Sequence, residues 1–381
     1  MTSPTRPTLP TWLASDRPMA RTVGRPMQRF LHVEASGGLV LLLATAAALI
    51  WANVASSSYS DFWHSEIGLD IAGFELREDL LHWTNDGLMV VFFFIVGLEI
   101  KREWEVGELV DRRAALLPAV GAVGGMVVPA LIFVAFNLGG ENVDGWGIPM
   151  ATDIAFALGV VAVVGDRVSG PLKVFLLTLA IVDDIGAIIV IAVFYSSSLA
   201  WDWLALAAVL IAVTYVMKRI RVWYLPVYVI AAFGIWLAMF ESGIHATLAG
   251  VILGIITPTH ALNRDLSRQQ LEATIAHPDL DPTSSAIEAA RLIYESVPVG
   301  SRLIRAIHPW TSFLIVPIFA LANAGIELSG DALTDAATSP VTLGIIVGLV
   351  VGKLLGIAGA VLVAVRTGYA HLPAQSTMPQ V

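Results

Sequence analysis

Stretches of apolar residues long enough to cross a lipid bilayer recur along this chain, and they constrain its fold more than any other feature. A helix that spans the hydrocarbon core needs about 20 such residues. Only 14% of the residues are charged, whereas soluble domains carry about 25%, so lipid must solvate much of the surface. The sequence predicts an all-α polytopic membrane protein with ten spans, at 36–54, 82–100, 114–136, 147–165, 172–196, 201–217, 223–240, 244–257, 309–327 and 341–365.

Positive charges orient the predicted spans. Of the 22 Lys and Arg residues, all but Arg77 and Lys353 fall at the two ends of the chain or in alternate connecting segments. Segments rich in Lys and Arg face the cytoplasm in membrane proteins. The chain is therefore predicted to cross the membrane many times, with its N-terminus in the cytoplasm.

Segments outside the spans complete the predicted domain organisation. Residues 1–33 are rich in Pro, Arg, Ser and Thr and are expected to form a disordered cytoplasmic tail. Residues 34–366 are expected to form the transmembrane domain, and 367–381 a polar C-terminal tail. No soluble domain of useful size is predicted.

Two connecting segments are long enough to hold structure of their own. Residues 58–80 contain alternating apolar positions on both sides of Ala72 and Gly73, which is typical of a β-hairpin, here outside the membrane. Residues 258–307 are predicted to form a polar cytoplasmic loop, in which 283–295 has the pattern of an amphipathic helix.

Four charged residues fall near the middle of predicted spans, namely Asp153, Asp183, Asp184 and Lys353. A charge at the bilayer centre costs at least about 2.5–3.5 kcal/mol, so it persists where it is paired, hydrated or functional. A purely structural role would be an Asp183–Lys353 ion pair that fixes helix packing. That pair leaves Asp153 and Asp184 uncompensated in a low dielectric, which is costly. We therefore expect the four residues to form a site.

Three carboxylates and one ammonium group can bind a small cation and titrate. Sodium and lithium ions prefer oxygen ligands, which carboxylates, the Thr152 hydroxyl and free backbone carbonyls supply. Consecutive helical residues point about 100° apart, so one of Asp183 and Asp184 can face the basic Lys353 while the other faces a cavity. Because a cation and protons compete for the same carboxylates, alternating access to such a site produces exchange. This needs no chemical step and no cofactor, so the chain is not expected to be an enzyme.

Five further polar residues lie in or near the predicted spans. Asp86 is either a helix-start acid or a functional group. Glu99 and Glu103 form either a solvated cluster at the inner face or a cation funnel and pH sensor. His245 is either a packing residue or a pH switch. Asn323 is expected to bond across helices.

Other classes of function are excluded by composition. The chain has no cysteine, which excludes disulfides and thiolate metal sites. It has no Gly-rich phosphate loop and no zinc motif, and its basic residues are dispersed. The expected partners are therefore ions and the lipid bilayer, and not nucleic acid.

Several strings, taken together and in order, closely resemble the NhaA-type sodium/proton antiporters. The resemblance runs from about residue 30 to residue 372. The strings are Asn85-Asp86-Gly87-Leu88-Met89, Gly97-Leu98-Glu99, the run ATDIAFALG at 151–159, the Asp183-Asp184 pair, the run HATLAG at 245–250, and Gly352-Lys353.

The resemblance implies a fold and a site. This family is one of the cases from which inverted repeats with discontinuous helices near the membrane midplane are known. Asp184 would be the main Na⁺ ligand, with Asp183 titrating and pairing with Lys353. Thr152 would add a ligand at a break in the fourth span, where Asp153 would offset the positive helix ends.

The resemblance also implies regulation, assembly and location. Glu99, Glu103 and His245 would form a pH-responsive region, with Asp86 as a further candidate. The hairpin at 58–80 would join two protomers into a homodimer. The exchange of cytoplasmic Na⁺ or Li⁺ for external protons would be electrogenic, would take place in a bacterial inner membrane and would serve sodium and pH homeostasis.

The sequence departs from the family in two places. Ile304 and Arg305 stand where members carry an acid and a histidine, and the chain ends after ten predicted spans where members have twelve. An alternative is therefore a non-transporting membrane subunit or an inactive truncated relic of the same fold. A passive channel is a third possibility, although one titratable site fits exchange better than conduction through several weak sites.

Overall fold

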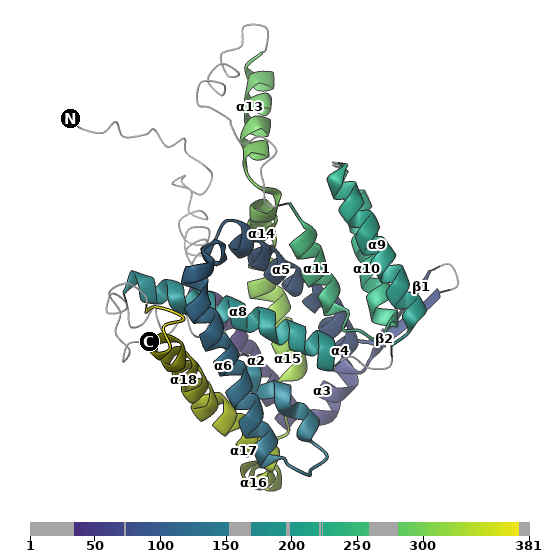
Figure 1. Cartoon of the computed structure of the whole chain (residues 1–381). Coiled ribbons are helices and arrows are strands. Elements are labelled where there is room, and N and C mark those ends of the chain that lie inside the picture. The colour runs from purple at the N-terminus through teal and green to yellow at the C-terminus, as the bar shows by residue number, and fades with distance from the viewer. Residues whose placement is uncertain are drawn as a thin grey trace, which may run out of the picture.

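A computed structural model of the chain describes residues 34–71, 74–151, 169–195, 199–220, 222, 224–258 and 281–372. Most of these residues are helical (Figure 1). The α-helices are α2 (Glu34–Val54), α3 (Ser56–Trp63), α4 (Leu80–His82), α5 (Met89–Glu105), α6 (Arg112–Phe136), α8 (Gly170–Phe194), α9 (Trp201–Arg219), α10 (Leu225–Glu241), α11 (Thr247–Ile256), α13 (Pro282–Ser296), α14 (Val299–Trp310), α15 (Val316–Asn323), α16 (Gly330–Thr338), α17 (Pro340–Val347) and α18 (Lys353–Arg366). The other elements are the strands β1 (Glu66–Ile71) and β2 (Phe74–Asp79), the π-helices η3 (Trp83–Leu88), η7 (Thr311–Ile315) and η8 (Gly348–Gly352), and the 3₁₀-helices η4 (Glu108–Val110) and η5 (Val143–Met150).

Seven helices in the described part of the chain are long and apolar enough to cross a membrane. Two shorter apolar helices, Pro226–Glu241 and Thr247–Ile256, accompany them. These nine helices overlap nine of the ten predicted spans, whereas the fourth, 147–165, lies outside the described residues from 152 onward. The helix Val299–Asn323 begins before its predicted start at 309, within the segment that was predicted to be a loop. The seven are Gly37–Val54, Leu80–Glu105, Ala114–Phe136, Pro171–Phe194, Trp201–Arg219, Val299–Asn323 and Pro340–Arg366.

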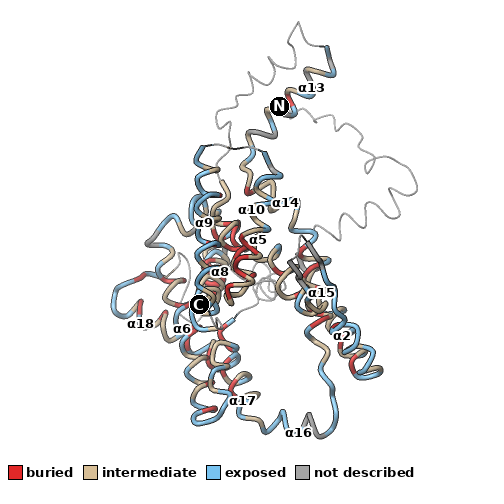
Figure 2. The backbone as a smooth tube through the Cα atoms, turned by 90° about the vertical axis from the view of Figure 1, so that its right-hand side faces the viewer, coloured by how far each residue is buried: buried red, intermediate tan, exposed pale blue. Residues whose placement is uncertain are grey.

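Large apolar side chains cover the outside of these helices. Val54 is 81% exposed, Ile230 71% and Leu42 68%. Figure 2 shows buried stretches in the interior and exposed ones along the outer helices. Water would disfavour such a surface, because burying apolar area is worth about 25 cal/mol per Å². The chain is therefore a multi-pass membrane protein, as its hydropathy predicts.

Two groups of helices have separate apolar cores. The α6 group consists of α6, α8, α17 and α18, and its core is formed by Leu117, Ala122, Leu172, Phe175, Leu179, Val361 and Ala364. The α11 group consists of α5, α9, α10 and α11, and its core is formed by Ala207, Ile235, Trp236, Ala238, Met239, Ala246 and Ala249.

Glycines allow both groups to pack backbone against backbone. In the α6 group, a Cβ atom at Gly124 would collide with the carbonyl of Gly356, and one at Gly356 would collide with the carbonyl of Gly124. In the α11 group, Gly250 and Gly254 meet the backbone of α5 in the same way. Membrane helices associate closely through small residues, because lipid supplies no hydrophobic force between them.

The predicted β-hairpin is present and is shorter than expected. β1 and β2 pair in antiparallel fashion, with Glu66 opposite Asp79. Residues 58–63, which are predicted to belong to the hairpin, instead belong to α3. Tyr59 and Trp63 lie four positions apart, with ring centroids 6.4 Å apart. Such a pair stabilises one helical turn, and a strand would place both rings on one face, too far apart to touch.

The predicted amphipathic helix at 283–295 coincides with α13, which projects from the other described helices (Figure 1). Asp281 precedes this helix and accepts hydrogen bonds from the backbone N–H groups of Thr283 at 2.8 Å and Ser284 at 3.0 Å. The Ser284 hydroxyl donates to it as well, at 2.7 Å. These hydrogen bonds, that of the Ser284 hydroxyl foremost, hold the pKa of Asp281 below its ordinary value. A charged cap therefore starts the helix.

Candidate functional site

A buried ion pair joins two helices of the α6 group. The Lys353 Nζ atom lies 2.8 Å from Asp183 Oδ2, and the Asp183 side chain is only 1% exposed. Asp183 lies in the middle of α8, and Lys353 is the first residue of α18. Removing either charge alone would leave the other buried without it, which is far costlier than burying both.

Helix α6 brings the two charged residues together because its glycines admit both neighbouring helices. A Cβ atom at Gly121 would lie 3.2 Å from Leu179 of α8 and 3.3 Å from Val361 of α18. One at Gly125 would lie 2.8 Å from Ile357 of α18. Leu179 and Ile357 each lie about one helical turn from the charged residue of their own helix. The small face of α6 therefore sets the distance between the two charges.

The segment that presents Lys353 is π-helical and tightly packed. A Cβ atom at Gly348 would lie 3.1 Å from Pro149 of η5, and one at Gly352 would lie 3.0 Å from the Cα atom of Pro129 in α6. Single π-helical turns inside longer helices occur frequently at functional sites. Because both positions have so little free space, the start of α18 is held closely against α6 and η5.

Asp184 follows Asp183 on α8 and is half-buried. Consecutive residues of a helix point about 100° apart, so the two carboxylates leave α8 in different directions. Asp183 is directed to Lys353. Asp184 therefore leaves α8 in another direction than Asp183, and its role as a cation ligand stays a prediction.

Thr152 and Asp153 lie outside the described residues. The chain leads toward them through η5, which ends at Met150 and is followed by Ala151 in an extended conformation, with φ −66° and ψ 145°. Residues 143–150 are 3₁₀-helical, whereas a regular span was predicted to begin at 147; Pro149, which lacks a backbone donor, lies in this segment. Within the described residues, no three His, Asp or Glu side chains gather closely enough to hold a metal ion.

Two of the predicted pH-response residues, Asp86 and His245, lie close enough to interact electrostatically. His82, which sequence analysis missed, interacts with Asp86 as well. Asp86 lies in η3, and its backbone carbonyl accepts a hydrogen bond from Trp236 Nε1 at 2.6 Å. His245 Nδ1 is buried and, among the described residues, has no hydrogen-bond partner. Three titratable groups therefore gather at one end of the α11 group.

The other two predicted pH-response residues, Glu99 and Glu103, lie at the opposite end of α5. Glu99 is exposed and interacts electrostatically with Arg102 and Glu103. Lys101 and Glu105 form an ion pair in the same two turns. This charged cluster belongs to the α11 group, whereas the Asp183–Lys353 pair belongs to the α6 group.

Asn323 bonds across helices, as the sequence predicts. Its Nδ2 donates to Asn85 Oδ1 at 2.9 Å, and Asn85 Nδ2 donates to Asn323 Oδ1 at 3.3 Å. The Tyr59 hydroxyl is hydrogen-bonded to the carbonyl oxygens of Leu321 at 2.9 Å and Ala322 at 2.7 Å. Sequence analysis missed Asn85 and Tyr59 as partners, because they are joined to this segment only through long-range contacts.

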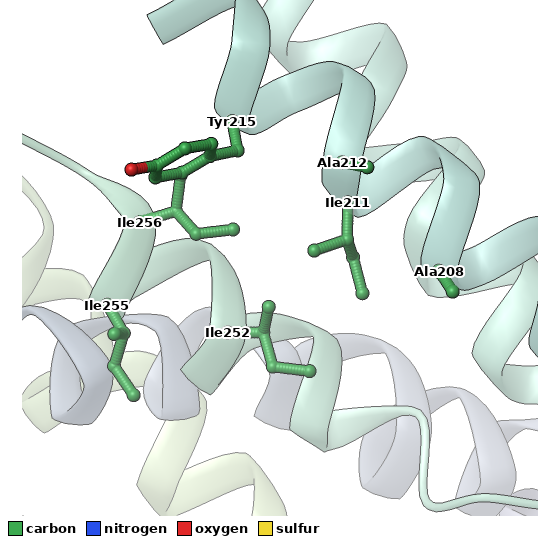
Figure 3. A pocket seen from close by; sticks show the side chains of 7 residues that line it. All are labelled: Ala208, Ile211, Ala212, Tyr215, Ile252, Ile255 and Ile256. Atoms are coloured by element: carbon green, nitrogen blue, oxygen red, sulfur yellow. The ribbon is translucent and has the colours of Figure 1, made fainter. Parts of the chain in front are cut away.

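A groove of about 420 Å³ lies between α9 and α11 (Figure 3). A cation needs oxygen ligands, and the Tyr215 hydroxyl is the one polar side-chain group among the lining residues. The groove is therefore unsuited to bind Na⁺. Its lining residues are Ala208, Ile211, Ala212, Tyr215, Ile252, Ile255 and Ile256.

Charges that are kept among membrane helices, where lipid disfavours them, mark proteins that move ions. The fold and the Asp183–Lys353 pair with its neighbour Asp184 place this chain in the class of ion-coupled secondary transporters.

Comparison with known proteins identifies the family within that class. The sequence model of the family described as Na⁺/H⁺ antiporter 1 matches residues 28–381. The chain is 44% identical to Na(+)/H(+) antiporter NhaA 2 of Sorangium cellulosum over 374 aligned residues. The alignment covers 95% of this chain and 80% of that protein. The chain is also 45% identical over 364 residues to Na(+)/H(+) antiporter NhaA of Rhodopirellula baltica, which covers 93% and 82%. The chain belongs to the Na⁺/H⁺ antiporter 1 family, so the predicted family is confirmed, and the chain is a transporter and not an enzyme.

Proposed function

We propose that this chain is a secondary active transporter that exchanges cytoplasmic Na⁺ for external protons. The observation that carries the proposal is the buried Asp183–Lys353 ion pair beside Asp184, in a chain whose relatives are named Na(+)/H(+) antiporters. An ion pair that served packing alone could be replaced by apolar residues at little cost. A titratable pair beside a second carboxylate supplies the groups that ion exchange needs.

The proposed mechanism is competition for one site. Asp184 is the main Na⁺ ligand, Asp183 and Thr152 contribute further oxygen atoms, and Asp153 offsets the positive helix ends nearby. A proton that binds to Asp183 replaces the Lys353 ammonium as its partner and removes the negative charge that Na⁺ needs. Na⁺ and protons therefore exclude one another, and alternating access to the two sides of the membrane couples their movements.

Regulation and ion choice extend the proposal. Li⁺ is a second substrate, because it also prefers oxygen ligands. The exchange is electrogenic and pH-regulated, and the pH-responsive residues are Glu99, Glu103, His245 and Asp86. Of these, Asp86 and His245 lie near enough to each other to interact electrostatically.

Location and assembly complete the proposal. The transmembrane domain at 34–366 lies in a bacterial inner membrane, with the tails at 1–33 and 367–381 in the cytoplasm. The predicted loop at 258–307 is cytoplasmic up to the start of the helix Val299–Asn323. The hairpin within 58–80 joins two copies into a homodimer. Its two strands pair with each other, and the outer edge of such a pair can accept a strand from a second copy.

Na⁺-induced collapse of a pre-formed pH gradient in everted membrane vesicles tests this function. The vesicles come from a host without antiporters of its own that expresses either this chain or its Asp184→Asn variant. We expect a response in the wild type that the variant abolishes, because asparagine keeps the size of the side chain and loses its charge. No response from a well-expressed, membrane-inserted wild-type chain would reject exchange and favour a non-transporting subunit. Na⁺ flux without proton movement would indicate a channel.

A further inference from the structure

Tyr195 is the residue that directly follows α8. Its side chain holds the segment that leads into the fourth predicted span. Its hydroxyl accepts a hydrogen bond from the backbone N–H of Gly147 at 2.7 Å. It donates another to the backbone carbonyl of Asp144 at 2.6 Å. Both partners belong to η5. In a 3₁₀-helix the N–H of residue i+3 pairs with the carbonyl of residue i, so one hydroxyl bridges the two groups that this turn would otherwise pair directly.

The contact between Tyr195 and η5 has little room to shift. A Cβ atom at Gly147 would lie 2.7 Å from the Tyr195 hydroxyl oxygen and 2.9 Å from its ring. The ring of Trp146 packs edge-on against Phe194, with centroids 5.2 Å apart, and lies 5.9 Å from the Tyr195 ring. The end of α8 and η5 are therefore held together by two hydrogen bonds and by contacts between aromatic rings.

The other end of η5 contacts the segment that presents Lys353. Pro149 is buried and lies against Gly348 of η8, where an added Cβ atom would be 3.1 Å away. η5 thus connects the two halves of the ion pair: its first half is bound to α8, which carries Asp183, and its second half packs on the turn before Lys353.

Tyr195 acts at a distance from the carboxylates. It directly follows α8 and lies eleven positions after Asp184, which corresponds to a rise of about 17 Å along a helix. It is therefore placed to set the position of the approaching chain and not to touch the ion. Helix α8 carries the two acids at its middle and is followed directly by Tyr195, so the hydroxyl can fix residues 144–151 relative to those acids.

We propose that Tyr195 is a positioning residue for Na⁺ binding, because its hydroxyl fixes residues 144–151 relative to the carboxylates of α8. This inference rests on the proposed Na⁺/proton exchange. Tyr195→Phe removes both hydrogen bonds and keeps the ring. Loss of one to two hydrogen bonds corresponds to a rise of about 3- to 10-fold in the Na⁺ concentration for half-maximal exchange. The maximal rate and the amount of inserted protein should stay unchanged.

Tyr228→Phe is the matched control. Its hydroxyl also donates to a backbone carbonyl, that of Val222 at 2.9 Å, and it lies in the α11 group. The control should leave the half-maximal Na⁺ concentration unchanged. An equal rise in both variants, or a lower maximal rate at an unchanged half-maximal concentration in Tyr195→Phe, would show a general structural role and overturn the inference.

A second measurement is independent of transport. The chain has no cysteine, so a single Ala151→Cys substitution reports on this segment through its rate of maleimide labelling. The rate should change several-fold when Tyr195→Phe is added and should stay the same with Tyr228→Phe. An unchanged rate in both would overturn the inference.

The two proposals can fail separately. If the wild-type chain exchanges and the Na⁺ dependence of Tyr195→Phe equals that of the wild type, the inference alone is wrong. If the wild-type chain shows no exchange, the proposed function is wrong. The Na⁺ dependence of the melting temperature of the purified variants then decides the role of Tyr195, because it reports binding without transport.

Discussion

Both groups of helices close around an apolar core, but among the described residues only the α6 group also buries an ion pair between two of its helices. Both groups bring backbones together at glycines, Gly124 on Gly356 in one and Gly254 on α5 in the other. The first then buries the Asp183–Lys353 pair. Close packing is therefore common to both groups, whereas the buried ion pair distinguishes the α6 group.

The α11 group contains a stack of aromatic rings around Trp236. The Trp236 ring stacks on Trp83 with centroids 6.0 Å apart and on Phe240 with centroids 5.7 Å apart. Its Nε1 donates to the Asp86 carbonyl. Its titratable residues, Asp86 and His245 at one end and Glu99 at the other, lie toward the ends of the α5 and α11 spans. If Na⁺ binds in the α6 group, as proposed, the α11 group is a scaffold beside it, and the following substitutions test that division.

The largest effect is expected at the ion pair. Lys353→Ala should lower the free energy of unfolding by about 3–5 kcal/mol, because it leaves the Asp183 charge buried without this partner. The double variant Asp183→Asn with Lys353→Met should recover most of that loss. Thermal unfolding of the purified protein in detergent measures both. Equal stability of the single and double variants would show that burial of the charge does not distinguish the α6 group.

A smaller effect is expected where backbones touch. Gly356→Val should lower the free energy of unfolding by about 1–3 kcal/mol, because its side chain would overlap the Gly124 carbonyl. Gly359→Val is the control, since a Cβ atom there meets no atom within 4 Å. The same thermal measurement applies. If the two variants had the same melting temperature, the close approach of the backbones at Gly356 would not stabilise this group.

Trp236→Phe probes the scaffold. It removes the hydrogen bond to Asp86 and part of the ring stack, so the free energy of unfolding should fall by about 0.5–1.5 kcal/mol. The Na⁺ concentration for half-maximal exchange in vesicles should stay that of the wild type. A clear shift in that concentration would mean that the α11 group takes part in Na⁺ binding and would break the division between the two groups.

The smallest effect is expected at the amide pair. A double-mutant cycle with Asn85→Ala and Asn323→Ala should give a coupling energy of about 0.6 kcal/mol, the average for hydrogen bonds between membrane helices. Thermal unfolding of the two single variants and the double variant yields this value. Additive losses, with no coupling, would show that the two amides stabilise their helices independently.

The spans and the ion pair could be predicted because the sequence states them locally. A run of about 20 apolar residues has few alternatives to a spanning helix. Lys353 is the one basic residue near the middle of a predicted span, so Asp183 or Asp184 had a single candidate partner at that depth. The need to pair a buried charge therefore predicted which two helices are in contact, which hydropathy alone does not reveal.

The remaining features depend on contacts that no local pattern encodes. Tyr195 meets Gly147 across 48 positions of sequence, and an aromatic residue at a helix end has many ordinary roles. The π-helical turn before Lys353 depends on packing against Pro129, which hydropathy does not reveal. α3 was missed because a stretch assigned to the hairpin by its neighbours is in fact held helical by the contacts of Tyr59.

The contact between Gly124 and Gly356 also limits how the protein can move. A side-chain contact can loosen through a change of rotamer, but peptide groups in direct contact have no rotamers to change. At the Gly124–Gly356 contact, helices α6 and α18 can separate only if one whole helix moves away from the other. A rearrangement that opens the surroundings of Lys353 to either side of the membrane therefore has to move both helices together as a rigid body. The backbone conformation would then have to change in the segments at the ends of the two helices.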